Sequence, residues 1–151
     1  MRSKKQILAS LDSFTRSYLE TAIWSSTDES DDRGGEPIDK NYTIEDFTIP
    51  SLLASIADCE AFQAQNETTL ASVYWTSENG SRLRNTDDAG HDFWLTRCGH
   101  GCGFWDGDYT EPHASVLTDA SKAFGNVDLY VYRGRIYAAG AEAPKRARRV
   151  A

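Results

Sequence analysis

Hydrophobic residues recur at helical spacing near the start of the chain. Between residues 4 and 23, Ile7, Leu11, Phe14 and Tyr18 follow one another at steps of three or four residues. This spacing places them on one face of an α-helix. Because no glycine or proline interrupts the range, the pattern predicts one continuous helix over residues 4–23.

A second helical pattern begins at Thr48. Pro50 falls in the first turn, where its missing N–H removes no helical hydrogen bond. The expected buried stripe consists of Leu52, Ile56, Cys59 and Phe62. The pattern continues to Trp75, and we expect a break near Asn66. Cys59 is interpreted as a small core residue.

The pattern changes over residues 77–106. Residues 77–90 are polar and rich in turn formers, which predicts a loop or a weak hairpin. Residues 92–97 have the composition of a strand, and residues 102–106 resemble a returning strand. The glycines of the intervening segment 99–101 suit a tight turn. The sequence therefore predicts a β-hairpin over residues 92–106.

The last part of the chain predicts a helix and a second hairpin. Residues 115–124 form the helical pattern, and Gly125 stands where a helix commonly ends. Residues 127–132 alternate between apolar and polar positions, Gly134 provides a turn, and residues 135–138 return. The predicted order is helix, helix, hairpin, helix, hairpin. This order indicates an α+β fold with a small antiparallel sheet of about four strands packed against helices.

Composition fits this fold and limits the class of protein. The chain has 151 residues, the size of one domain; we expect that domain over residues 1–140. Residues 141–151 form a basic tail that we expect to be disordered. No apolar run approaches membrane-spanning length, and we recognise no secretory signal peptide. The three cysteines are an odd number, which favours a reduced, cytoplasmic protein over a disulfide framework.

Acidic residues are concentrated in one segment of a chain whose formal net charge is -7. We define the acidic segment as residues 27–46, which contain eight carboxylates against Arg33 and Lys40. The ligand spacing of a calcium-binding loop is missing. The alternatives are a solvated loop and an electrostatic contact for a basic partner.

The range 90–108 (GHDFWLTRCGHGCGFWDGD) concentrates candidate chemistry. Cys98, His100 and Cys102 could bind zinc, but structural zinc sites need a second ligand pair, and only His91 and His113 are available to supply it. A Cys–His dyad is conceivable, yet no cysteine-protease signature is present. We therefore predict no metal and no cofactor.

Two further readings of the same range remain open. A small hydrolase acting on nucleotide or nucleic acid could use His91, Asp92, His100 and Asp106, if these side chains converge in one pocket. A single-stranded nucleic-acid binder could stack bases on aromatic strand residues, although the accompanying basic groove is missing. The aromatic candidates are Trp94, Phe104, Trp105, Tyr130 and Tyr132.

Four stretches of the chain carry a resemblance to a known family. AGHDFWLTRCGHGCGFWDGD is followed by LTDASKAFGNVDLYVYRGRIY, and upstream lie AIWSSTDESDDRGGEPIDKNYTIEDF and ADCEAFQAQN. Together these stretches resemble a family of small, largely uncharacterised proteins of tailed bacteriophages and prophages. The family motif carries Asn and Ala at the positions of Cys98 and Cys102. The resemblance thus argues against shared zinc or cysteine chemistry and implies no activity or cofactor.

The resemblance and the charge together give a functional expectation. We expect a phage accessory protein that binds a host or defence-system protein in the host cytoplasm. It would inhibit that system in the manner of anti-CRISPR or anti-restriction proteins, with an acidic surface imitating nucleic acid. Membrane binding is not expected, and the oligomeric state is not predicted. The expected partner-binding residues are Asp28, Glu29, Asp31, Asp32, Trp94 and Trp105.

Overall fold

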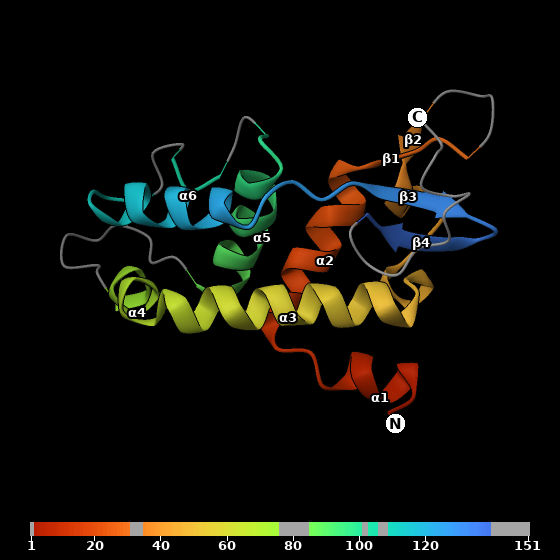
Figure 1. The fold of residues 1–151 in the computed structure, drawn as a ribbon, viewed down its shortest axis with the longest axis horizontal. Coiled ribbons are helices and arrows are strands. Elements are labelled where there is room, and N and C mark those ends of the chain that lie inside the picture. Colours follow the sequence, from red (N-terminus) through yellow and green to blue (C-terminus); the bar gives the residue numbers. More distant parts are fainter. Residues whose placement is uncertain (1, 31–34, 76–84, 101–102, 106–108, 140–151) are drawn as a thin grey trace.

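The computed structural model describes residues 2–30, 35–75, 85–100, 103–105 and 109–139 (Figure 1). Within these ranges it contains six α-helices and two antiparallel sheets of two strands each. The predicted α+β class is confirmed. The single sheet of about four strands is wrong, because the strands pair as two separate two-stranded sheets. The expected tail, residues 141–151, lies outside the described residues.

The predicted first helix is two helices, α1 (Lys4–Ala9) and α2 (Ser13–Ser25). A capping box of Ser3 and Gln6 starts α1. The carboxylate of Asp12 accepts a hydrogen bond from the Thr15 N–H and starts α2. Because an N-cap residue has an extended backbone, the chain cannot remain helical through Asp12. One continuous helix over residues 4–23 is therefore wrong.

The second helical region is confirmed together with its break. Helix α3 (Ile49–Gln65) begins after Thr48, whose side chain accepts from the Ser51 N–H. Asn66 ends α3, and its amide nitrogen donates to the Phe62 carbonyl at 2.8 Å. Helix α4 (Glu67–Trp75) follows directly.

The predicted hairpin over residues 92–106 is wrong, because residues 92–97 belong to helix α5 (Thr86–Arg97). A capping box of Asn85 and Asp88 starts this helix. Two acidic residues in its first turn stabilise it further by interacting with the positive end of the helix dipole. The helix is buried on nearly every side from Ala89 to Arg97. Tertiary packing thus determines its conformation, and no polar face marks it as amphipathic.

The C-terminal elements follow the sequence prediction. Helix α6 (His113–Ala123) ends before Gly125, whose φ of 79° is in the left-handed region. Strands β3 (Leu129–Tyr132) and β4 (Arg135–Ala138) form the second hairpin.

The acidic segment contains short elements. Strand β1 (Thr27–Asp28) pairs with β2 (Glu36–Pro37). Two 3-10 turns follow, η1 (Ile38–Lys40) and η2 (Ile44–Asp46). The Thr48 N–H then donates to the Ile136 carbonyl at 3.0 Å, which ties the end of the segment to β4.

An aromatic core joins the helices. Figure 1 shows α5 between α3 and α6, and α2 beside α5 on the side of the two small sheets. The sheets lie together at one end of the molecule, and α1 lies outside the other helices. The rings of Phe62 and Phe93 stack with centroids 4.1 Å apart, and Phe14 packs against both. Gly90 lies so close to α2 that a Cβ there would meet the Phe14 carbonyl oxygen at 2.1 Å. The described helices include none long and apolar enough to cross a membrane.

Candidate binding surface

The histidines and acids of the range 90–108 are not gathered in one described pocket. His91 on α5 pairs its Nδ1 with the Thr21 hydroxyl at 2.9 Å, and its ring lies beside Trp24. Asp92 is buried. His100 follows the end of α5 and lines a polar groove that neither His91 nor Asp92 lines. Asp106, the fourth residue of the hydrolase hypothesis, lies outside the described residues.

The two described thiols, Cys59 and Cys98, have surroundings unsuited to nucleophilic catalysis. Burial raises the pKa of the Cys98 thiol, which donates weakly to the Val127 carbonyl at 3.4 Å. Burial raises the pKa of Cys59 further above its ordinary value. A protonated thiol is a poor nucleophile and a poor metal ligand. Among the described residues, no cluster of three or more His, Cys, Asp or Glu side chains could hold a metal ion; Cys102 lies outside that range.

Arg97, which the sequence analysis left without a role, is the most extensively bonded side chain of α5. Its guanidinium donates to the Tyr18 hydroxyl at 3.0 Å and to the Asp58 carboxylate at 2.8 Å. It also donates to the carbonyls of Phe124 and Gly125 at 2.9 and 2.8 Å. These partners belong to α2, α3 and the end of α6, so Arg97 links three elements to α5.

The setting of Arg97 explains why a charge can be buried there. Its guanidinium lies 5.5 Å from the centroid of the Phe93 ring and 5.6 Å from that of Phe124. Burial alone would lower the pKa of Arg97, but Tyr18 and Asp58 outweigh this and raise the pKa. A cation at the carbonyl end of α6 also complements the helix dipole. Arg97 is therefore structural, and four of its five N–H donors are engaged by the protein.

The polar groove lies between the end of α2, the end of α5 and the loop before β3. Its volume is about 320 Å³. Trp94 lines the groove, and its indole nitrogen donates to the Ser25 hydroxyl at 2.7 Å. Two carboxylates, Glu29 of the acidic segment and Asp128, also line it. The residues that line the groove are mainly polar: Ser25, Ser26, Thr27, Glu29, Trp94, Cys98, His100, Asn126, Val127, Asp128 and Leu129.

Apolar side chains fix the acidic segment to the body, while four of its six described carboxylates are exposed. Ile38, Ile44 and Phe47 are buried in the core. Four acidic residues on the same segment are exposed: Glu29, Glu36, Asp39 and Glu45. Asp28 is half-buried and accepts from the backbone and hydroxyl of Ser30. Asp31 and Asp32 lie outside the described residues.

The predicted aromatic anchors differ in exposure. Trp94 is only 2% exposed, so its assignment as a surface anchor is wrong, and Phe104 of the base-stacking hypothesis is also fully buried. Trp105 is 42% exposed and lies over Lys122 of α6. The sequence analysis did not identify Trp24 as an aromatic anchor, although this side chain is 57% exposed. The next residue in the chain, Ser25, lines the polar groove. The sequence offered one signal for Trp24, namely its position at the end of a helical pattern and next to the acidic segment.

Comparisons with protein-family models, with curated proteins and with solved structures find no match to this chain. The binding surface is therefore interpreted from its own geometry.

Proposed function

We propose that this chain is a phage accessory protein that binds a host defence protein in the bacterial cytoplasm and inhibits it. The acidic segment is the contact surface, and it imitates the phosphates that a nucleic-acid-processing complex would bind. The resemblance over residues 90–108 supports the phage assignment. The arrangement of the acidic segment supports binding as the mode of action.

One observation carries the proposal: buried apolar residues anchor residues 35–46 of the acidic segment, and three of the four carboxylates there are exposed. Because Ile38, Ile44 and the following Phe47 are buried, residues 35–46 follow a fixed path beside α2. The three exposed carboxylates there are thus presented on a defined surface. Fixed charges of one sign accelerate association with a partner of opposite sign and orient it.

Trp24 adds an apolar contact beside these charges. Tryptophan is enriched among the residues that dominate binding energy in protein interfaces. Trp24 precedes the acidic segment by only a few residues and is more than half exposed. We assign it as the aromatic anchor in place of Trp94, while Trp105 stays a prediction for a contact beside α6.

The hydrolase alternative has less support in the geometry. It needs a general base and acid in reach of one substrate. His100 faces the polar groove, whereas His91 is bonded to Thr21 and Asp92 is buried. A binding role needs no such convergence.

The test is capture of the partner from bacterial lysate with the full chain as bait, followed by mass spectrometry. The test variant carries Asp28→Asn, Glu29→Gln, Asp31→Asn and Asp32→Asn. The control variant removes four acids elsewhere, all of them exposed: Glu20, Glu60, Glu67 and Asp119.

We expect the wild type and the control variant to enrich the same defence protein, and the test variant to lose it. Each exposed ion pair is worth about 0.2–1 kcal/mol, so the loss of four such pairs weakens binding by about fourfold or more. Equal enrichment by both variants would refute the acidic-segment contact. Enrichment of no defence protein by the wild type would refute the proposed function.

A further inference from the structure

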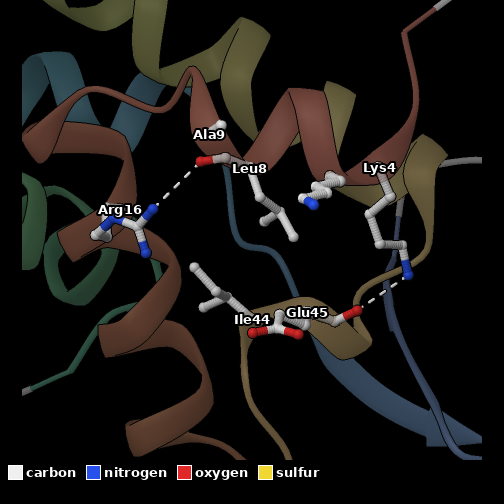
Figure 2. A pocket seen from close by; sticks show the side chains of 7 residues that line it. Lys4, Leu8, Ala9, Arg16, Ile44 and Glu45 are labelled. Atoms are coloured by element: carbon white, nitrogen blue, oxygen red, sulfur yellow. Dashed lines mark hydrogen bonds between the residues drawn. The ribbon is translucent and has the colours of Figure 1, made fainter.

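A second hollow, which we call the N-terminal pocket, lies between α1, α2 and η2 (Figure 2). Its volume is about 510 Å³, within the range of sites for small molecules. The residues that line it are Lys4, Lys5, Leu8, Ala9, Arg16, Ile44 and Glu45. None of them belongs to the polar groove or to the range 90–108.

The pocket has an apolar centre with cations at its edges. Figure 2 shows Leu8 of α1 and Ile44 of η2 pointing toward each other across the hollow. Arg16 lies at one end and donates to the Leu8 carbonyl at 3.2 Å. Lys4 lies at the other end and donates to the Glu45 carbonyl at 3.0 Å. These two bonds hold both walls of the pocket through backbone oxygens.

The cations keep donors available for a ligand. An ammonium group has three N–H donors and a guanidinium has five. The side chains of Lys4 and Arg16 each use one donor on the carbonyls named above. The Lys5 side chain has no hydrogen-bond or ion-pair partner among the described residues. An entering anion would therefore gain hydrogen bonds without breaking those that hold the pocket.

The charge of the pocket is opposite to that of the whole chain. Three basic side chains and the single carboxylate of Glu45 line it, in a protein with a net charge of -7. Burial lowers the pKa of Lys4, and repulsion by Arg135 lowers it further, although Asp46 and Glu45 oppose both effects. A bound anion would relieve the repulsion between these cations and stabilise the charged form of Lys4.

We propose that the N-terminal pocket binds a small amphiphilic anion, a molecule with a carboxylate or phosphate head and a short apolar body. The head pairs with Lys5 and with Lys4 or Arg16, and the apolar body lies between Leu8 and Ile44. A nucleic-acid strand fits less well, because a polyanion needs a continuous basic track. Here the cations surround one hollow with an apolar centre.

The test titrates the full chain with hexanoate and hexyl phosphate, which share the apolar body and differ in the head. Hexanol, hexylammonium and inorganic phosphate serve as comparison probes. Backbone amide shifts locate the site, and calorimetry gives the affinity. We expect both anionic amphiphiles to bind more tightly than the three comparison probes, with shifts confined to residues 4–16 and 44–46. A preference between hexanoate and hexyl phosphate identifies the head.

Substitutions test the residues. Lys5→Gln removes a charge that makes no described contact, so the fold should be unaffected. Lys122→Gln on α6 is the matched control. Because an exposed ion pair contributes little to binding, we expect Lys5→Gln to lower the affinity for the preferred anion by about two- to fivefold. Arg16→Gln should lower this affinity by a similar factor, and Arg16→Lys should retain most of it. Lys122→Gln should leave the affinity unchanged.

Several results would overturn the proposal. If hexanol binds as tightly as the anions, charge does not contribute to binding. If inorganic phosphate binds as tightly, the apolar centre does not contribute. Equal affinities for wild type and Lys5→Gln would show that the anion binds elsewhere. A single-stranded oligonucleotide that binds through the same residues and displaces hexyl phosphate would replace the small anion with nucleic acid.

Discussion

Replacing Gly90 by alanine tests the packing of α5 against α2. On helix propensity alone, Gly90→Ala should stabilise the protein, because alanine is favoured over glycine inside a helix by about 1 kcal/mol. The contact with α2 predicts the opposite. The added Cβ would lie 2.1 Å from the Phe14 carbonyl oxygen and 2.9 Å from its carbon, where ordinary contacts begin at 3.4 Å.

The clash cannot be relieved by a side chain. The atoms met by the new methyl group belong to the backbone of α2, so the two helices must move apart by about 1 Å. That movement loosens the contacts of Phe14 with Phe62 and Phe93. Overpacking of a close-packed core, with the backbone shifts that it forces, destabilises by about 1–3 kcal/mol and occasionally by more. We expect a net loss of about 2 kcal/mol in the free energy of unfolding.

Urea denaturation followed by tryptophan fluorescence measures this loss, and calorimetry should show a fall in Tm of about 4–8 °C for a chain of this size. The control is Gly125→Ala, which also adds a methyl group but meets no atom within 4 Å. Its cost arises from the left-handed backbone alone, about 1 kcal/mol. If Gly90→Ala were as stable as the wild type, the close approach of α2 and α5 would be wrong.

Three further predictions concern buried polar groups. Arg97→Met should lower the free energy of unfolding by about 2–4 kcal/mol, measured by urea denaturation, because Tyr18 and Asp58 lose a charged partner. Arg97→Lys should retain only part of the wild-type stability. Full stability of either variant would contradict the structural role of Arg97. In a Cys102→Ser background, Cys59 and Cys98 of the folded protein should react slowly with a thiol reagent at neutral pH, because burial raises the pKa of both thiols. Both should react fast once urea unfolds the chain. A fast reaction of the folded protein would contradict this prediction. Burial raises the pKa of Tyr74 to about 12, and its hydroxyl has no hydrogen-bond partner among the described residues. The unfolded chain therefore releases this proton first, and stability present below about pH 10 is lost as the pH rises toward 12. Tyr74→Phe should be at least as stable as wild type at neutral pH and should lose less stability over that alkaline range, which denaturation at several pH values measures.

Local signals predicted the elements whose ends they mark. Asn66 breaks the helical region because its side chain caps the preceding turn, and Gly125 ends α6 because the backbone there has a positive φ. Alternation over residues 127–138 predicted β3 and β4. In these places the sequence-local preference and the tertiary packing agree, so one sequence was sufficient.

Helix α5 could not be recognised from periodicity. Its residues from Phe93 to Arg97 are all buried, so the helix has no polar face to contrast with an apolar one. Aromatic and β-branched residues in a short run then resemble a strand. The Asn85–Asp88 capping box was a usable signal, but it lay in a stretch interpreted as loop because of its polarity.

The candidate surface was predictable only in its charge. The concentration of acids over residues 27–46 is visible in the sequence. The burial of Trp94 and the exposure of Trp24 are not, because both depend on how α2 packs against α5. The N-terminal pocket likewise depends on the break at Asp12, which turns α1 away from α2 and opens the hollow that Lys5 and Ile44 line.

The central claim is that the acidic segment, and no cluster within residues 90–108, carries the function. The most direct measurement is the dissociation constant of the captured partner at low and high salt, for wild type, the test variant and the control variant. We expect the test variant to bind at least about fourfold more weakly at low salt and to show a smaller salt dependence, with the control variant close to wild type. Unchanged affinity and unchanged salt dependence in the test variant would contradict the claim.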